Sequence, residues 1–236
     1  MGGLFDDIGH TVFKDLSVLS PHYVPKDLPY RTGEIKQISR ILQPVLNGVK
    51  PNNIFIYGKT GTGKTSVVKL VMRELEKTVE KQDRGVLVKT VYMNCRMGYN
   101  SKYQVLVRIL EDDCFKRKGL RDKPLEGVRT GRLEGRSPVE LYSRLRKVVE
   151  SNAIKLVVVL DEVDMTREVD ELIYVLTRTN DEIETIESGG KPMRGSVSVI
   201  GISNKHSFRN NLDTRTKSTL CEEEIVFKPY NAKELA

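Results

Sequence analysis

The sequence predicts an α/β domain built around a mostly parallel sheet. Short apolar runs with the character of buried strands alternate with longer stretches in which apolar residues recur at helical spacing. The composition agrees: 39% hydrophobic and 30% charged residues are typical of a globular protein and exclude a disordered or collagen-like chain. The length of 236 residues allows one to two domains and a substantial core.

The first half of the chain predicts two helices and two strands. Apolar residues at helical spacing predict a helix over residues 35–46, and a buried strand follows at residues 53–57 and ends at Gly58. A helix over residues 64–80 comes directly after it. Residues 86–94 are rich in Val, Thr and Tyr, which is typical of a strand.

The second half continues the alternation. Helices are expected over residues 103–115 and 138–151, the latter with Ser137 as N-cap and Pro138 at its first position. Strands are expected at residues 156–160 and 197–202, with a short last one at 224–227. Residues 189–192, GGKP, predict a loop before the strand at 197–202.

Charge, hydropathy and cysteine content limit the possible classes of function. The net charge of +7 is compatible with an acidic partner but is weak evidence alone. The longest clean apolar run near the middle, residues 156–160, is far shorter than the roughly 20 residues of a membrane span. Acidic residues within the first 20 do not fit a secretory leader, so we expect an intracellular protein with no membrane partner. Cys95, Cys114 and Cys221 form no CxxC pair and are expected to be reduced thiols.

Residues 58–65, GKTGTGKT, match the pattern G-x-x-x-x-G-K-[ST] in full and are called the phosphate loop below. Glycines let backbone N–H groups approach phosphate oxygens, and the following helix N-terminus adds a favourable field. Lys64 is expected to reach the β- and γ-phosphates, and the Thr65 hydroxyl to bind Mg²⁺. The alternative is a glycine-rich turn that contains Lys-Thr by chance, which the flanking strand and helix disfavour. The remaining expected nucleotide contacts in the loop are Gly58, Thr60, Gly61, Thr62 and Gly63.

Two further strand ends carry polar residues that suit the same site. Asp161 ends the strand at residues 156–160 and is expected in the Mg²⁺ shell, with Glu162 orienting the attacking water. The alternative is that two acids merely end a core strand on the solvent side. Asn204 follows another strand and, beside these motifs, is expected near the γ-phosphate, although an Asn after a strand is also an ordinary turn residue. The Asp-Glu pair favours ATP hydrolysis over a small-molecule kinase reaction.

These residues together resemble the archaeal replication initiators of the AAA+ class, which are related to the large subunit of the eukaryotic origin-recognition complex and to the cell-division-control helicase loader. The resemblance covers nearly the whole chain. It includes YVP at 23–25, LPYR at 28–31, NCR at 94–96 and LDTRTKS at 212–218. It implies a three-layer P-loop AAA+ ATPase core with a mostly parallel central sheet, a basic insertion, and ATP or ADP with Mg²⁺ as cofactors.

The resemblance also implies roles for residues outside the phosphate loop. Val24 and Pro25 would supply apolar contact to the adenine, and Arg31 a polar one; otherwise they form a helix entrance without a ligand. Arg215 matches the arginine finger that would reach the γ-phosphate of a neighbouring subunit, whereas a basic loop residue is ordinarily just solvated.

The family carries an insertion after its second strand that contacts DNA. The corresponding residues 116–136 contain eight basic and three acidic side chains, a composition that suits phosphate contacts without sequence readout. The alternative is a solvated charged loop, and the stretch is longer and richer in Arg and Gly than the family's usual insertion. The expected DNA contacts are Lys116, Arg117, Arg121, Arg129 and Arg132.

The implied organisation is one AAA+ nucleotide-binding domain over residues 1–236, with an adenine-side segment at 1–32, the basic insertion at 111–137, and no lid or winged-helix domain. The expected function is an ATP-binding and ATP-hydrolysing switch in replication initiation. It would bind double-stranded origin DNA and help load the replicative helicase, with other initiator subunits, in the cytoplasm at the nucleoid. Without a lid we expect weak hydrolysis and weak, nonspecific DNA binding. The alternative is a signalling or defence ATPase of related fold that acts on protein partners.

Overall fold

A five-stranded sheet forms the centre of the molecule, with strand order β2-β3-β6-β1-β7 and every neighbouring pair parallel. The computed structural model describes residue 25 and residues 28–82, 85–116, 125–127, 133–188, 190–220 and 223–235. The strands are β1 (Ile54–Gly58), β2 (Val88–Asn94), β3 (Lys155–Asp161), β6 (Ser196–Ser203) and β7 (Glu223–Phe227). The expected α/β class with a parallel sheet is confirmed.

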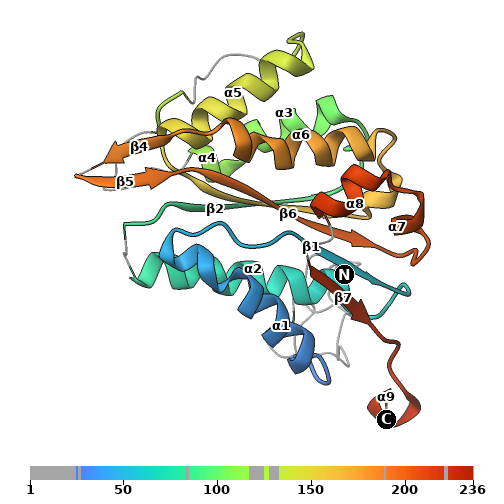
Figure 1. Cartoon of the computed structure of the whole chain (residues 1–236). Coiled ribbons are helices and arrows are strands. Elements are labelled where there is room, and N and C mark those ends of the chain that lie inside the picture. Colours follow the sequence, from blue (N-terminus) through green and yellow to red (C-terminus); the bar gives the residue numbers. More distant parts are fainter. Residues whose placement is uncertain are drawn as a thin grey trace, which may run out of the picture.

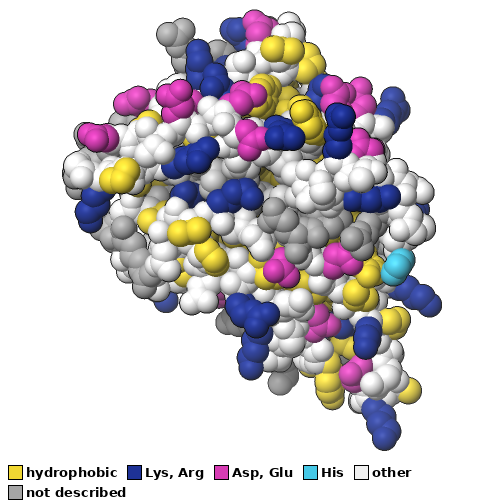
Figure 2. Space-filling view, viewed as in Figure 1, with side chains coloured by type: hydrophobic (Ala, Val, Ile, Leu, Met, Phe, Trp, Pro, Cys, Tyr) yellow, Lys and Arg dark blue, Asp and Glu magenta, His cyan; other side chains and the backbone are white. Residues whose placement is uncertain are grey.

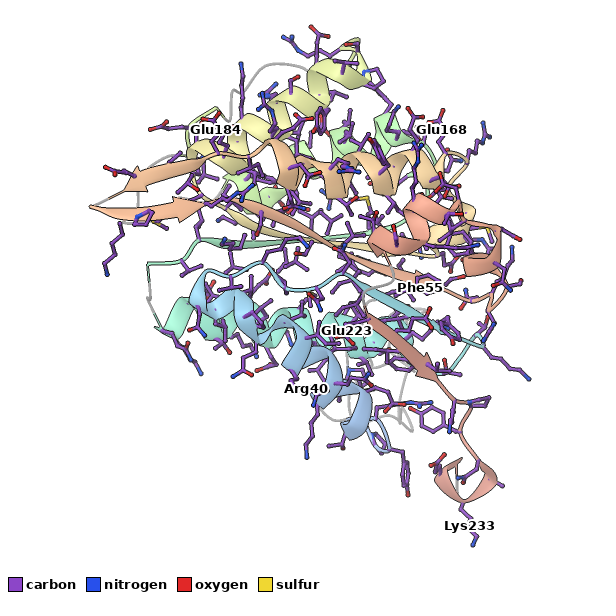
Figure 3. All side chains as sticks on the ribbon, in the orientation of Figure 1. Arg40, Phe55, Glu168, Glu184, Glu223 and Lys233 are labelled. Atoms are coloured by element: carbon purple, nitrogen blue, oxygen red, sulfur yellow. The ribbon has the colours of Figure 1, made fainter. Side chains whose placement is uncertain are left out.

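Helices cover both faces of this sheet and make three layers (Figure 1). One face carries α1 (Thr32–Leu42), the 3-10 turn η2 (Gln43–Asn47) and α2 (Lys64–Gln82). The other carries α3 (Lys102–Glu111), α5 (Pro138–Ser151) and α6 (Val169–Glu182). A parallel strand between two helix layers is buried on both faces, which explains why all of β3 and β6 is buried. Side chains, Phe55 among them, fill the space between the sheet and the helices (Figure 3).

Two predicted helices end earlier than their apolar pattern suggests. The helix expected over residues 35–46 changes to 3-10 geometry at Gln43, where Pro44 has no N–H to continue the α-helical ladder. The helix expected over residues 103–115 is interrupted at Asp112, whose backbone is extended. The Asp112 carboxylate accepts the N–H of Cys114 at 2.9 Å and so begins the short helix α4 (Asp113–Lys116).

The structure also contains elements that the apolar pattern did not predict. Residues 191–192, expected in a loop, begin strand β5 (Lys191–Arg194), which pairs antiparallel with β4 (Thr185–Ser188). That hairpin is short and largely exposed, so it lacks the alternation that identifies a half-buried strand. The helix α6 was not expected either, although its buried Leu172, Ile173 and Leu176 recur at helical spacing. The remaining additions are the short helices η4 (Val163–Met165), α7 (Phe208–Asn211), α8 (Thr214–Leu220) and α9 (Ala232–Leu235).

The basic insertion connects α4 to α5, and its described residues are fixed to the helices beneath. Leu125 and Leu133 are buried in the core. The Asn152 side chain at the end of α5 accepts the Glu126 N–H and donates to the Glu126 carbonyl, both at 2.9 Å. The insertion is therefore attached to the fold at two places, around Leu125 and Glu126 and at Leu133. Of the expected DNA contacts, Lys116 ends α4 with no side chain described, and Arg117, Arg121, Arg129 and Arg132 lie outside the described residues.

On the face shown in Figure 2, basic and acidic side chains of the described residues are interspersed, without a continuous band of one sign. Among the described helices, none is long and apolar enough to cross a membrane.

Cys95 and Cys114 are buried free thiols, in agreement with the expectation of reduced cysteines. Burial raises the pKa of Cys95 to about 11 and also raises the pKa of Cys114, so both thiols are protonated at neutral pH. Cys221 lies outside the described residues.

Candidate active site

The phosphate loop joins the end of β1 to the start of α2, and its glycines are required by its geometry. A Cβ on Gly58 would lie 2.4 Å from the carbonyl oxygen of Phe227 on β7, so only glycine fits where the two strand ends meet. Gly61 and Gly63 have φ angles of 81° and 86°, a region that favours glycine. The buried Thr62 hydroxyl donates to the Lys59 carbonyl at 2.8 Å and closes the loop on itself. Thr60 is exposed at its tip.

Lys64 begins α2, and its ammonium lies inside the phosphate loop. The whole residue is only 5% exposed. Its Nζ donates to the carbonyls of Gly58 and Lys59 at 2.7 and 2.9 Å and to the Asn204 Oδ1 at 2.8 Å. Burial lowers the pKa of Lys64, and the nearby carboxylates, led by Asp161, oppose that shift. The ammonium is therefore already desolvated, and its partners are two backbone carbonyls and one side-chain amide.

The next residue, Thr65, faces the acid at the end of β3. The Thr65 hydroxyl donates to the Asp161 Oδ2 at 2.7 Å, and Asp161 is 3% exposed. The Tyr92 hydroxyl, from the end of β2, donates to the same oxygen at 2.6 Å. A hydroxyl and a carboxylate side by side are the hard oxygen donors that Mg²⁺ prefers. Among the described residues no group of three or more His, Cys, Asp or Glu could hold a metal.

Glu162 follows Asp161 in an unusual backbone conformation. Its φ of 51° and ψ of 44° are left-handed, which is uncommon for a residue other than glycine and costs energy. In this turn the Glu162 N–H donates to the Asp161 Oδ1 at 2.9 Å. The buried Glu162 Oε2 makes no hydrogen bond to any described residue, and the Arg96 guanidinium lies 3.9 Å away. Among the described residues, this oxygen therefore has the Arg96 guanidinium as a charged neighbour and no hydrogen-bond donor.

Asn204 reaches Lys64 because β6 lies between β3 and β1 in the sheet. The carboxyl ends of parallel strands meet at one edge, so Asn204 at the end of β6 lies between the phosphate loop and Asp161. The preceding Ser203 fixes this strand end, since its hydroxyl donates to the Asp164 Oδ1 at 3.0 Å. The structure thus brings together Lys64, Thr65, Asp161, Glu162 and Asn204, the residues singled out in the sequence.

Of the residues expected on the adenine side, Arg31 makes hydrogen bonds within the chain. Arg31 is 4% exposed and its guanidinium donates to Glu34 Oε1 at 2.7 Å and to the Lys228 carbonyl at 2.8 Å. It also lies over the Tyr230 ring at 4.1 Å. Only its Nε has no hydrogen bond among the described residues, so Arg31 chiefly fastens the start of α1 to the segment after β7. Pro25 is half-buried, and Val24 lies outside the described residues.

Arg215 lies apart from this cluster. It is exposed on α8, which packs against α6 at the edge of the molecule (Figure 1). Its side chain has no hydrogen bond or ion pair with any residue that the structure describes.

Two residues of the site were given no role from the sequence: Tyr92, and Tyr230, which belongs to the FKPY stretch at 227–230 that resembles the family. The sequence placed Tyr92 only within an expected strand. Its position two residues before the end of β2 is the signal that could have indicated a place in the site. Tyr230 stacks on Arg31, and its hydroxyl would lie 3.5 Å from a Cβ at Gly63, so it borders the phosphate loop. Neither contact has a local sequence pattern, because each joins segments far apart in the chain.

Comparison with known proteins identifies relatives of this chain. Residues 27–183 match the family model described as AAA ATPase domain. The ORC1-type DNA replication protein of Pyrococcus abyssi is 41% identical over 226 residues, which cover 95% of this chain and 49% of the relative. ORC1-type DNA replication protein 1 of Sulfurisphaera tokodaii is 43% identical over 227 residues, with 95% and 50% covered. The chain therefore spans about half the length of the curated relatives it matches.

A solved structure is similar as well. The Aeropyrum pernix ORC1 protein in complex with DNA matches with a TM-score of 0.74 at 37% identity, over 93% of this chain and 50% of the other. The CDC6P protein of Pyrobaculum aerophilum matches with a TM-score of 0.70 at 21% identity, over 94% and 51% of the two chains, which shows a shared fold.

Proposed function

This chain belongs to the AAA ATPase family and is homologous to ORC1-type replication proteins, and from that premise we propose that it is an ATP-binding and ATP-hydrolysing switch in replication initiation. The observation that carries the proposal is the convergence of Lys64, Thr65, Asp161 and Asn204 at one edge of the sheet, held by hydrogen bonds of 2.7–2.8 Å. A glycine-rich loop, a desolvated cation and a hydroxyl–carboxylate pair together form a site for a nucleoside triphosphate with a divalent cation.

Each side chain has a distinct role in the proposed reaction. Lys64 exchanges its carbonyl and Asn204 partners for the β- and γ-phosphates, which carry more negative charge than those neutral acceptors. Thr65 and Asp161 would hold Mg²⁺, which neutralises charge on the phosphates. Glu162 accepts a proton from the attacking water through its hydrogen-bond-free oxygen. Asn204, released from Lys64, is then placed to contact the γ-phosphate.

The switch is proposed to act on double-stranded origin DNA and on the loading of a replicative helicase, together with other initiator subunits. The similar Aeropyrum pernix ORC1 protein was solved in complex with DNA, which supports a DNA partner. The composition of the basic insertion supports it further, because eight basic against three acidic side chains at residues 116–136 suit contacts with phosphates.

Duplex DNA binding by the insertion should be insensitive to sequence and steeply dependent on salt. Each phosphate neutralised contributes about −0.9 to the slope of log K against log[salt], so four lost contacts flatten that slope by up to roughly three to four units. The test replaces the four arginines of the insertion by alanine and measures fluorescence anisotropy with labelled duplex DNA across a salt series. The replaced residues are Arg117, Arg121, Arg129 and Arg132.

A matched control removes the same charge from elsewhere on the surface. Four exposed basic residues on α1, α2 and β5 serve for this purpose: Lys36, Arg40, Lys77 and Lys191. Their replacement lowers long-range attraction equally but removes no proposed contact, so the slope should stay near that of the parent chain. Equal slopes for both quadruple variants would exclude the insertion as the DNA contact and favour a protein partner.

Arg215 is proposed to reach the nucleotide of a neighbouring subunit. Arg215→Ala should leave nucleotide affinity unchanged at low protein concentration, because its side chain contacts none of the described residues of its own site. It should lower only the part of ATP hydrolysis that rises with protein concentration, by about tenfold or more. Arg178→Ala, which removes an exposed arginine from α6, is the control. A loss of ATP affinity at high dilution would place Arg215 in its own subunit's site instead.

The overall function is tested by phosphate release from ATP with no acceptor present and by duplex DNA affinity with and without nucleotide. We expect Mg²⁺-dependent release and a DNA affinity that differs between the ATP and ADP states. Phosphate transfer that requires a small-molecule acceptor, or hydrolysis without any coupling to DNA, would contradict the proposal.

A further inference from the structure

Tyr92 contacts the carboxylate of Asp161 from the neighbouring strand. The register of β2 and β3 pairs Tyr92 with Val159 and Asn94 with Asp161. Side chains alternate along a strand, so Tyr92 and Asp161 are on the same face, two positions apart along the ladder. A tyrosine is long enough to span that diagonal, and its hydroxyl donates to the Asp161 Oδ2 at 2.6 Å.

The Asp161 carboxylate accepts hydrogen bonds from three donors, which come from three different segments of the chain. The Glu162 N–H donates to Oδ1 at 2.9 Å, and the hydroxyls of Thr65 and Tyr92 both donate to Oδ2 at 2.7 and 2.6 Å. A carboxylate oxygen has two lone pairs, so the two hydroxyls use both lone pairs of Oδ2. Among the described residues, Oδ1 accepts only the Glu162 N–H and keeps a lone pair for a metal or its water. The ring of Tyr92 is fixed in turn by α2, because the Lys69 Nζ lies 4.5 Å from its centroid.

We propose that Tyr92 is a positioning residue for the metal of the nucleotide site, acting through Asp161. Thr65 has two tasks, since its hydroxyl holds Asp161 and is also a proposed metal ligand. Tyr92 has only one partner there, and its hydrogen bond fixes the rotation of the Asp161 carboxylate independently of Thr65. The inference rests on the proposed nucleotide site and adds to it a residue that touches neither nucleotide nor metal.

Tyr92→Phe removes this hydrogen bond and keeps the ring beside Lys69. Hydrogen-bond partners of metal ligands typically change metal affinity 10- to 100-fold, so we expect the affinity of the protein–ADP complex for Mn²⁺ to fall about tenfold. The measurement is titration with Mn²⁺ as a paramagnetic probe, followed by electron paramagnetic resonance of the free ion. Affinity for ADP in EDTA should be unchanged, because the Tyr92 hydroxyl donates to Asp161 and to no phosphate-loop residue among those that the structure describes. In hydrolysis, the Mg²⁺ concentration for half-maximal rate should rise more than the maximal rate falls.

Tyr103→Phe is the matched control, because Tyr103 is a half-buried tyrosine on the opposite helix layer with a hydroxyl 3.5 Å from the Leu133 carbonyl. It should leave every one of these values unchanged. Equal Mn²⁺ affinity in the two variants would overturn the inference and leave the nucleotide site intact. Equal loss of ADP affinity with and without metal would show that Tyr92 is merely structural. Failure of the parent chain to bind ADP with Mn²⁺ would overturn the proposed site itself.

A second measurement uses the unsubstituted protein, so it does not depend on the variant folding. Tyrosine labelled with ¹³C at Cζ reports on the hydroxyl, and addition of Mg²⁺ to the ADP complex should shift the Tyr92 signal while the Tyr103 signal stays in place. An unmoved Tyr92 signal would show that the hydroxyl is not coupled to the metal.

Discussion

Replacing Lys64 by alanine is expected to lower the affinity for ATP by about 100-fold. The ammonium is the main cation of the phosphate loop, and it is already desolvated in the folded chain. Hydrogen bonds to charged groups contribute about 1.5–3 kcal/mol each, and 1.4 kcal/mol corresponds to a tenfold change, so losing one or two such bonds accounts for this loss. Isothermal titration calorimetry with ATP and Mg²⁺ measures it.

Lys77→Ala is the matched control, because Lys77 is an exposed lysine on the same helix, paired with Glu74. It removes the same charge from α2 without touching the site. Lys64→Ala also removes the donor to the Gly58 and Lys59 carbonyls, so thermal unfolding must first establish that the variant is folded. An equal affinity for ATP in the two variants would show that the phosphate loop is not the ATP site.

Replacing Glu162 by glutamine is expected to stop hydrolysis and to leave binding of ATP and Mg²⁺ within about twofold. The substitution keeps the size of the side chain and removes the base that accepts the proton of the attacking water. A positioned general base typically contributes 10²–10⁴-fold, so the rate of phosphate release should fall by about that factor. Single-turnover hydrolysis with pre-bound ATP separates this effect from nucleotide exchange.

Glu168→Gln is the control, since Glu168 is an exposed glutamate at the start of α6 (Figure 3). It removes the same negative charge from an exposed position and should change neither binding nor hydrolysis. Abolished ATP binding in Glu162→Gln would identify Glu162 as a metal ligand or as a residue needed for the turn after β3. Undiminished hydrolysis would mean that another group activates the water.

The local parts of the site could be predicted from the sequence because their signals are local. A strand, a glycine-rich turn and a helix follow one another at residues 54–82, and the Asp161-Glu162 pair ends a strand that is apolar on both faces. Backbone conformation at such places depends on residues within a few positions of one another. The pairing of acid and loop followed from a rule of parallel sheets, that ligands bind at the carboxyl ends of the strands.

The contacts that join these parts were decided by the tertiary structure alone. Strand order places β6 between β3 and β1, and only this order lets Asn204 reach Lys64 across 140 positions of sequence. The same holds for Tyr92, whose contact with Asp161 depends on the register of β2 against β3. Arg31 belongs to the LPYR stretch singled out in the sequence, but its bond to the Lys228 carbonyl joins positions 197 residues apart and has no local signal. Strand order and register follow from burying apolar faces between two helix layers, a cooperative property of the whole chain that no short segment contains.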